Sequence, residues 1–492
     1  MSLARAVAWN THVQIVGRLV GLLASIALTA LIIRHLGTAT YGQYTAASAY
    51  VSLFMILGEF GLYLVAIRRA SQEPEQRARI LGTALGLRLT WTLVPLGIAV
   101  LGAQLIPSQR YPTYEPVVKS TIAILALNEY VRLLCQFLTG VFRMHLRMEL
   151  AVVGEVGSRV LALLGVGLVA QAGGGLRWVA AALLVANSAN LVWAWLMSQR
   201  LERFRAQLHS PLVRQLAREA VVVAGVLVLS LLRGQIGILL LSLMRPTEEV
   251  GIYGVAIKVY EVLITFPGML IALLYPVLSR LASEDRERLR RIFQRTFDVM
   301  LLAATGLCLL LEVLAPQIAA ILGEPRASQP MRVLALALPG AFVGMSFAHL
   351  VLAEGRQSLI LRLYLFLAIA STAANVLLIP RFSYMGVGAI LVATETSVML
   401  TLALYWTRIR DLKLQLRTLW SPPIAVAIGW LVHRLAAAWI DAPGLDLRWR
   451  LLVVVGLGLV IVASYVAAVL GLRLVQMEVV RSLLPGGNTA DG

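Results

Sequence analysis

Six cationic residues fall inside strongly apolar stretches of the sequence. Arg159 follows Glu155 by four residues and is expected to pair with it on one helix face, which leaves five candidates: Arg18, Arg88, Arg132, Arg233 and Lys258. An ionised group near the middle of a bilayer costs about 3 kcal/mol, so such a residue faces a polar cavity, an interface or a charged partner. A guanidinium donates two parallel hydrogen bonds to a phosphate or carboxylate, and lysine adds a point charge. We therefore expect these side chains to bind an anionic group, unless acids neutralise them.

Two of the five have an acidic residue at helical spacing. Glu129 precedes Arg132 by three residues, and Glu261 follows Lys258 by three. Residues three apart share a helix face, so each pair can neutralise itself.

The remaining cations are Arg18, Arg88 and Arg233. No acid lies three or four residues from Arg18 or Arg233, which makes these two the strongest candidates for anion binding. Arg88 lies about two turns inside its apolar stretch, from which a long side chain can also reach the interface.

Four glutamates also lie deep in apolar stretches: Glu59, Glu129, Glu312 and Glu395. They can pair with the cations, or they can gain and lose a proton, because burial raises the pKa of a carboxyl group. We therefore expect them to be charge partners or groups that couple transport to a proton or sodium gradient. His349 is expected to be a hydrogen-bonded packing residue.

The sequence contains none of the common signatures of enzyme chemistry. It has no phosphate-binding loop of the form GxxxxGK[ST], no nucleophile elbow and no cluster of metal ligands. Cys135 and Cys308 fall inside apolar stretches and are expected to pack there as free thiols. We therefore predict no cofactor and no metal, and a transporter rather than an enzyme.

Composition identifies the medium in which the chain folds. Of its 492 residues 59% are hydrophobic and only 14% are charged, and the mean hydropathy is +0.82. So few polar side chains cannot coat a water-facing globule. The net charge of +18 would suggest a nucleic-acid partner in a soluble protein, but here the cations lie mostly in the loops between apolar stretches, as membrane insertion requires. We therefore predict an all-α integral membrane protein that does not bind nucleic acid.

Apolar runs bounded by charge, proline or glycine predict about fourteen membrane-spanning helices, each of roughly 20 residues or more. The predicted spans are residues 11–34, 44–67, 80–106, 117–142, 150–171, 177–198, 217–243, 250–279, 297–322, 331–353, 359–380, 384–406, 421–440 and 450–471.

The loops on one side of these spans carry most of the arginine and lysine. The most basic are residues 68–79, 200–218, 280–295 and 408–417. Basic loops stay in the cytoplasm, so both termini are expected there, with the chain in the cytoplasmic membrane. No small-residue cleavage site follows the first apolar run, so we expect no cleaved signal peptide. Residues 283–295 alternate charged and apolar side chains and are expected to form a short amphipathic helix on the membrane surface.

The sequence also contains an internal repeat. Tyr41-Gly42-Gln43-Tyr44 opens the second span, and Val250-Gly251-Ile252-Tyr253 opens the eighth, 209 residues later. A second correspondence links the glycines at 173–175 with residues 384–389. A parallel repeat places a pseudo-two-fold axis along the membrane normal and a pathway between two lobes. We predict six-helix lobes over residues 1–205 and 206–415, followed by a terminal helix pair over residues 416–492.

Several of these motifs resemble the polysaccharide (O-antigen type) flippases of the multidrug/oligosaccharidyl-lipid/polysaccharide exporter superfamily. The likeness is carried by residues 34–44 (RHLGTATYGQY), 59–62 (EFGL), 250–253 (VGIY), 274–280 (LYPVLSR) and 379–389 (IPRFSYMGVGA). Such proteins often have an aspartate near the end of the seventh span, where this chain has Arg233-Gly234-Gln235.

The resemblance implies an alternating-access carrier with a cationic central cavity. Its substrate would be an oligosaccharide linked to undecaprenyl pyrophosphate, carried from the cytoplasmic to the outer leaflet for cell-surface polysaccharide synthesis. The expected partners are membrane lipids and, in the same pathway, a polysaccharide polymerase and glycosyltransferases. The competing interpretations are a flippase for a peptidoglycan lipid precursor, a multidrug exporter of the same superfamily, and a membrane polymerase or ligase.

Overall fold

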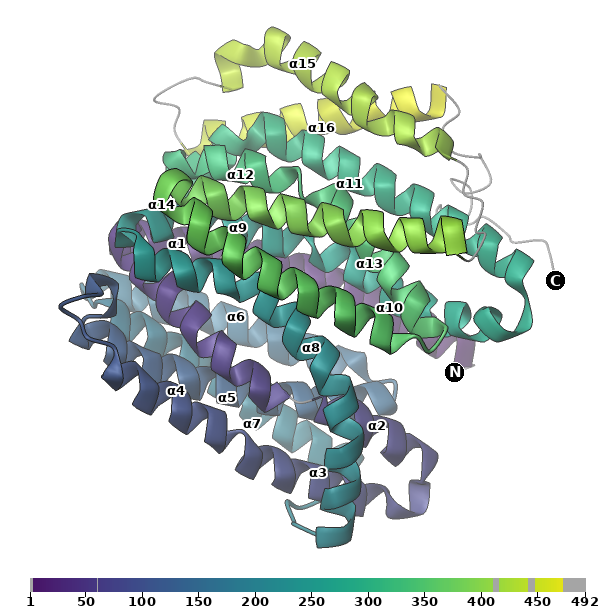
Figure 1. The fold of residues 1–492 in the computed structure, drawn as a ribbon. Coiled ribbons are helices and arrows are strands. Elements are labelled where there is room, and N and C mark those ends of the chain that lie inside the picture. The colour runs from purple at the N-terminus through teal and green to yellow at the C-terminus, as the bar shows by residue number, and fades with distance from the viewer. Residues whose placement is uncertain (1–2, 60, 410–415, 441–446, 472–492) are drawn as a thin grey trace. The chain divides into compact units, whose positions relative to one another are not determined.

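The computed structural model describes residues 3–59, 61–409, 416–440 and 447–471, and every regular element within these ranges is helical (Figure 1). Contacts between the helices divide the chain into two compact units. The first comprises Met1–Gly254 and Ala368–Ser383, and the second comprises Val255–Leu367 and Tyr384–Gly492. The prediction of an all-helical chain is confirmed.

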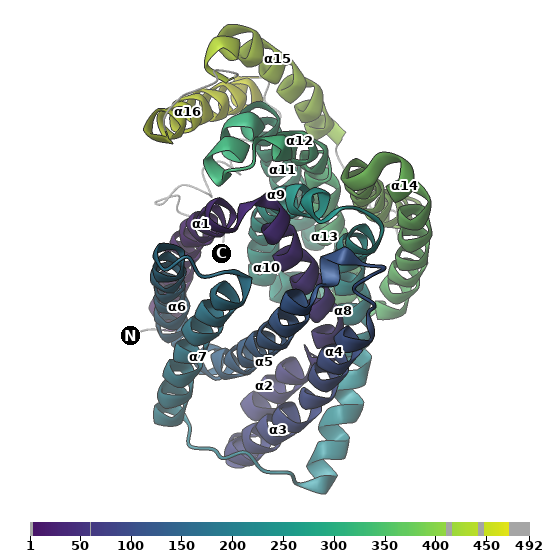
Figure 2. The ribbon, with the colours of Figure 1, turned by 90° about the vertical axis from the view of Figure 1, so that its left-hand side faces the viewer.

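The first unit holds eight complete helices and the start of a ninth. They are α1 (Leu3–Glu59), α2 (Leu62–Gln72), α3 (Arg77–Trp91), α4 (Leu93–Leu105), α5 (Pro116–Met144), α6 (Met148–Gln171), α7 (Leu176–Leu201) and α8 (Ser210–Met244). Helix α5 contacts α1, α4 and α7, and α6 packs against α1 and α7 (Figure 2). Phe137 and Phe142 of α5 are completely or almost completely buried in one of the unit's cores, and Tyr114 is buried in another.

The second unit holds most of the remaining helices. They are α9 (Thr247–Leu263), α10 (Thr265–Glu284), α11 (Arg286–Leu322), α12 (Ser328–Ala335), α13 (Leu338–Ala353), α14 (Gln357–Leu404), α15 (Ser421–Ile440) and α16 (Leu447–Gly471). Helix α11 contacts α12, α13, α15 and α16, and α15 and α16 lie side by side against it (Figure 1).

Among the described residues, nine stretches are long and apolar enough to cross a membrane, or ten if a pair bent by 43° counts as one. Two of them, Val20–Gln72 and Gln357–Arg408, run for 53 and 52 residues. Since one crossing needs about 20 residues, each of these two has the length for two crossings. Backbone kinks divide them, at Gly37 with φ 75° and at Ser383 with φ 50°. The prediction of a multi-pass membrane protein is confirmed.

Helix boundaries recur with the offset of the sequence repeat. Helix α3 begins at Arg77 and α11 at Arg286, and α6 begins at Met148 and α14 at Gln357, each pair 209 residues apart. Two helices therefore begin at equivalent positions of the repeat in both halves of the chain.

The expected surface helix over residues 283–295 is wrong. Arg286 to Arg295 form the first turns of the 37-residue helix α11, and the side chain of Asp285 caps it by accepting a hydrogen bond from the Arg288 amide at 2.9 Å. Leu289 and Phe293, one turn apart, are buried inside the protein. The apolar side of the stretch therefore packs against other helices, because i,i+4 spacing suits a helix–helix contact as well as a lipid surface.

One predicted span is interrupted where the sequence predicts a continuous helix. Gly61, with φ 62°, separates α1 from α2, whereas Thr92 between α3 and α4 and Ile264 between α9 and α10 keep helical backbone angles inside continuous apolar stretches. A helix end leaves carbonyl groups without helical partners, and inside a membrane other groups of the protein must satisfy them. The break at Gly61 carries the candidate site.

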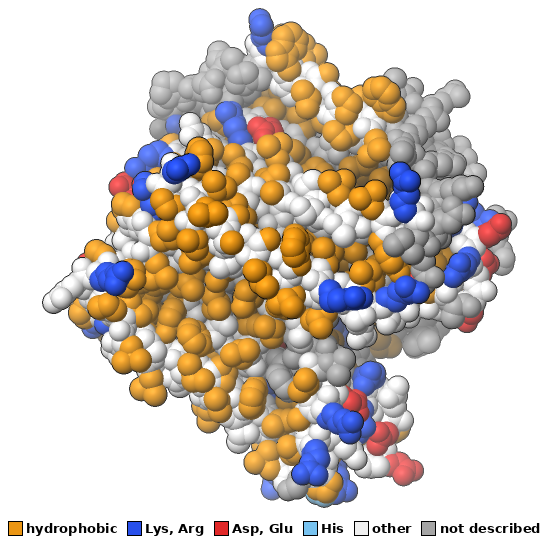
Figure 3. Space-filling view, viewed as in Figure 1, with side chains coloured by type: hydrophobic (Ala, Val, Ile, Leu, Met, Phe, Trp, Pro, Cys, Tyr) orange, Lys and Arg blue, Asp and Glu red, His pale blue; other side chains and the backbone are white. Residues whose placement is uncertain are grey.

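Charged side chains are unevenly distributed over the first unit. In Figure 3 they gather at the end where α2, α3 and the start of α8 lie, while hydrophobic side chains cover the flank over α4. At that end Arg68 and Arg69 both bind the carboxylate of Glu219, at 2.7 and 2.6 Å. Exposed apolar flanks with charged ends are what a lipid environment selects.

Candidate functional site

A cluster of charges in the first unit is built around the break between α1 and α2. Glu59 is the last residue of α1, and its carbonyl oxygen accepts a hydrogen bond from Arg88 Nη1 of α3 at 2.8 Å. The carbonyl of Leu57, one turn earlier than the break, accepts a hydrogen bond from Trp91 Nε1 at 2.9 Å. Side chains of α3 thus supply the donors that an interrupted helix lacks.

Arg88 is completely buried and also forms an ion pair within the cluster. Its Nη2 lies 3.1 Å from Glu59 Oε2 and 3.3 Å from the carbonyl oxygen of Leu133 in α5. Gln136 Nε2 donates to the other carboxylate oxygen of Glu59 at 3.1 Å. The interpretation that Arg88 reaches toward the interface is wrong, because Glu59 and two main-chain carbonyls hold it inside the unit.

Arg132 and Glu129 form the exposed part of the cluster. Arg132 Nη2 lies 2.6 Å from Glu129 Oε2, and the Arg132 side chain is 57% exposed. Arg132 also interacts electrostatically with Glu59. Because Arg132 lies in the middle of the apolar stretch Pro116–Met144, an exposed guanidinium there is far more stable facing a polar cavity than facing lipid.

The other three predicted cations lie elsewhere. Arg233 is half-buried in α8 of the first unit. Lys258 lies in the second unit, with its Nζ 3.1 Å from Glu261 Oε2 and 47% of its side chain exposed. The side chain of Arg18 lies outside the described residues. The structure therefore brings Arg88 and Arg132 together with Glu59 and Glu129, and it does not extend this cluster to the rest of the set.

The remaining two glutamates of the predicted set lie in the second unit. Arg332 Nε donates to the main-chain oxygen of Glu312 at 3.0 Å, and the Arg332 charge also acts on the Glu312 carboxylate. Glu395 of α14 lies where α14 passes close to Gly340 of α13. His349 Nδ1 lies 2.9 Å from the carbonyl oxygen of Met345 on its own helix, so its ring is hydrogen-bonded as expected.

Sequence reasoning missed Gln136 and the α1 partners of Arg159. Gln136 completes the hydrogen bonding of Glu59, and its spacing from the other charges gave no signal. Arg159 of α6, which the spacing pairs with Glu155, donates to the Gly21 carbonyl and the Ser25 hydroxyl of α1. The spacing of Gly17 and Gly21 was the available signal, since small residues four apart mark a close approach of two membrane helices.

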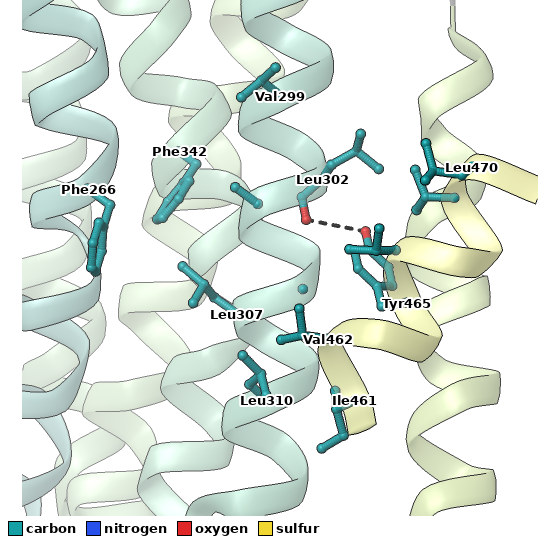
Figure 4. Close-up of a pocket in the computed structure, with 14 residues that line it drawn as sticks. Phe266, Val299, Leu302, Leu307, Leu310, Phe342, Ile461, Val462, Tyr465 and Leu470 are labelled. Atoms are coloured by element: carbon teal, nitrogen blue, oxygen red, sulfur yellow. Dashed lines mark hydrogen bonds between the residues drawn. The ribbon is translucent and has the colours of Figure 1, made fainter. Parts of the chain in front are cut away.

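The second unit contains an apolar cavity of about 480 Å³ between α10, α11, α13 and α16. Figure 4 shows Phe266, Phe342, Leu307 and Val462 around it. Tyr465 brings a hydroxyl group, which donates to the carbonyl of Leu302 at 3.3 Å. Such a lining suits hydrocarbon and offers little to a sugar or a phosphate.

No group of three or more metal-ligating side chains occurs among the residues that the structure describes. Cys135 is buried and Cys308 is half-buried, both as free thiols. Their surroundings fit the packing role expected for them.

Comparison with known proteins places this geometry in context. The sequence pattern of polysaccharide biosynthesis proteins matches residues 3–282, and that of the MatE family matches residues 223–377. No curated protein matches the sequence. The fold is similar to "Lipid II flippase MurJ, inward closed conformation", with a TM-score of 0.71 and 12% identity over 94% of this chain and 98% of the other.

Two further transporter structures are also similar. One is the inward-facing conformation of a multidrug resistance MATE family transporter of the MOP superfamily, with a TM-score of 0.67 and 12% identity over 80% of this chain and 95% of the other. The second is a MOP superfamily transporter from Pyrococcus furiosus Vc1, with a TM-score of 0.63 and 15% identity over 83% of this chain and 96% of the other. The chain thus shares the fold of these proteins. With more than half of its length matched by one family pattern, the chain belongs to the polysaccharide biosynthesis protein family.

Proposed function

We propose that this transporter is a flippase that moves an oligosaccharide linked to undecaprenyl pyrophosphate from the cytoplasmic to the outer leaflet. Family membership supports a substrate of polysaccharide synthesis. The observation that carries the proposal is Arg132, a guanidinium more than half exposed in the middle of an apolar stretch, whose nearest anion is on its own helix. A pyrophosphate entering the polar space beside it would compete with Glu129 for its donors.

The cluster gives different tasks to its two arginines. Arg88 is enclosed by Glu59 and main-chain carbonyls, so its task within the proposal is to fix the break in α1 and to hold Glu59. Arg132 makes the contact with the headgroup. Arg18, Arg233 and Lys258 are proposed to add positive charge along the pathway, while Glu59, Glu129, Glu312 and Glu395 are proposed as charge partners or ion-coupling groups.

The apolar cavity of the second unit supports the proposal that the substrate contains a lipid chain. A chain of isoprene units needs a dry surface, and the cavity offers one with Phe266 and Phe342 on its wall.

The membrane arrangement belongs to the same proposal. We place both termini in the cytoplasm, the chain in the cytoplasmic membrane, and fourteen crossings in two six-helix lobes with a terminal pair. The length of Val20–Gln72 and of Gln357–Arg408, enough for two crossings each, supports that number.

Flipping in sealed vesicles tests the proposal. Purified protein is reconstituted with a polyprenyl-pyrophosphate-linked oligosaccharide, and the substrate that becomes accessible to an added glycosidase is measured. Arg132→Ala should lower the rate about 10- to 100-fold, because hydrogen bonds to a charged group contribute about 1.5–3 kcal/mol. Lys119→Ala, which removes a cation in the first turn of α5 that is bonded to the Gln104 carbonyl, is the matched control and should flip normally.

Three outcomes would overturn the assignment. Equal rates for a polyprenol lacking the pyrophosphate would remove the headgroup from recognition. Faster flipping of a peptidoglycan precursor lipid would transfer the chain to that substrate, and drug efflux without lipid flipping would make it an exporter. Collapsing the proton and sodium gradients separately tests coupling, and unchanged rates in both cases would exclude it.

A further inference from the structure

The two copies of the glycine motif meet each other inside the first unit. Gly42 lies in the part of α1 that follows the kink at Gly37, and Gly251 lies in the second turn of α9. A Cβ atom placed on Gly42 would overlap the carbonyl oxygen of Thr247, and one placed on Gly251 would overlap the carbonyl oxygen of Thr38. The two backbones are therefore in direct contact, and only glycine fits at either position.

This contact is symmetric in the numbering of the repeat. Thr247 follows Thr38 by 209 residues, and Gly251 follows Gly42 by the same number, so each half of the contact is the repeat copy of the other half. A contact between equivalent parts of two copies lies on the axis that relates them. In a transporter built from a parallel repeat, that axis is also the axis of the pathway.

Polar contacts brace each copy of the repeat on its own side of the crossing. In the first copy, His35 Nε2 lies 2.6 Å from the carbonyl oxygen of Gly174. In the second copy, Arg245 binds Glu249 at 2.8 Å, and Ser383 donates to the same carboxylate. Ser383 follows Gly174 by 209 residues, so both braces tie the first loop of a copy to the turn between its fifth and sixth spans.

The crossing itself is made differently from the braces. Its two faces meet through Cα–H groups that approach carbonyl oxygens, and such contacts are much weaker than the charged hydrogen bonds of the braces. Hydroxyl contacts flank it, between Thr113 and Thr247 at 3.3 Å and between Tyr114 and Ser242 at 2.9 Å. Two braced bodies that meet across a weak, close-fitting seam can separate there without breaking internally.

We propose that the crossing of Gly42 with Gly251 closes the transport pathway at the end away from the basic loops, and that the two glycine faces separate each time that end opens. The proposal rests on the transport function above. Since no side chain fits between the faces, any larger residue at either glycine holds the seam apart and shifts the protein toward the open state.

A disulfide across the seam gives the first test. Thr113→Cys and Thr247→Cys are introduced into a chain with Cys135→Ala and Cys308→Ala, and the oxidised pair should lower flipping at least 10-fold, with recovery on reduction. The control pair is Thr305→Cys with Ser421→Cys, whose hydroxyl groups lie 3.4 Å apart within the second unit. Full flipping with the seam pair completely oxidised, judged by loss of free thiols, would overturn the proposal.

Thiol labelling gives a second test that needs no substrate. In the same cysteine-free chain, Arg132→Cys is labelled from the outside by a membrane-impermeant maleimide. Gly42→Val or Gly251→Ala should raise the labelling rate several-fold. Gly97→Val is the control, because a Cβ atom there meets nothing within 4 Å.

Each test decides without the other, so a variant that fails to fold or a disulfide that fails to form leaves the other test in force. Unchanged labelling in a folded glycine variant would mean that the crossing is a permanent packing contact. If the labelling rate rises but the protein flips none of the test lipids, the proposal that the crossing closes the pathway stands and the proposed substrate is refuted.

Discussion

Replacing Arg88 separates a structural charge from a substrate-binding one. Arg88→Met takes the paired guanidinium from the buried Glu59, which keeps its hydrogen bond from Gln136, and loss of one member of a buried ion pair costs about 3–5 kcal/mol. It also removes the donors of the Glu59 and Leu133 carbonyls, at about 1 kcal/mol each. We therefore expect a loss of at least about 5 kcal/mol, enough to unfold most of the protein.

The double variant Glu59→Gln with Arg88→Met tests where that energy resides. It removes both charges, so only the two unsatisfied carbonyls remain, at about 2 kcal/mol in total. Folded protein should therefore partly recover. Arg132→Met should cost no more than about 1 kcal/mol, because its pair with Glu129 is largely exposed, yet it should abolish most flipping.

The measurements are membrane abundance, the fraction that stays monodisperse in detergent after heating, and flipping in vesicles. The reasoning predicts that Arg88→Met fails the first two and that Arg132→Met fails only the third. A stable Arg88→Met protein that folds like the parent and no longer flips would refute it, since Arg88 would then serve the substrate and not the helix break.

Three further predictions follow from single contacts. Lys258→Gln should slow flipping with little change in melting temperature. Glu261→Gln, which removes the carboxylate that binds this lysine, should retain or raise the rate, and equal losses in both variants would mean that the pair itself is needed. Ala303→Trp should fill part of the apolar cavity and weaken photocrosslinking of a polyprenyl probe. Leu168→Trp, on an exposed apolar face, is the control and should leave the photocrosslinking unchanged. Equal crosslinking in the two variants would place the lipid chain elsewhere. Asp285→Ala should remove the cap of α11 and lower stability by about 1 kcal/mol in a thermal melt without changing flipping, and an unchanged melt would show that the cap contributes nothing.

The sequence predicts the helices of this protein well because a crossing is set by length and hydropathy, which are local properties. It also predicts the repeat, because Gly42 and Gly251 mark equivalent turns. It does not predict the break at Gly61, because isolated glycine residues are common within continuous membrane helices.

The partner of Arg88 could not be found for a related reason. Spacing shows only acids one turn away on the same helix, and Glu59 lies 29 residues earlier on another helix. The end of α1 also supplies a main-chain acceptor that the sequence does not reveal. By contrast, the pairs of Arg132 and Lys258 are local and form as the spacing predicts.

The two copies of the repeat share the glycines of the crossing but not the charges of the cluster. The offset of 209 residues carries glycine onto glycine at the crossing, but it carries Glu59 onto Gly268 and Arg88 onto Phe297.

The exposed pair behaves in the same way, with Glu129 carried onto Leu338 and Arg132 onto Ala341. A scaffold that moves as two similar halves needs the same contacts in both, so its hinge and seam residues recur. A lipid with one charged headgroup has no such symmetry, and a site for it needs its charges only once. The charges that occur in a single copy are therefore the ones to test for substrate binding, and among them those that stay exposed inside the membrane come first.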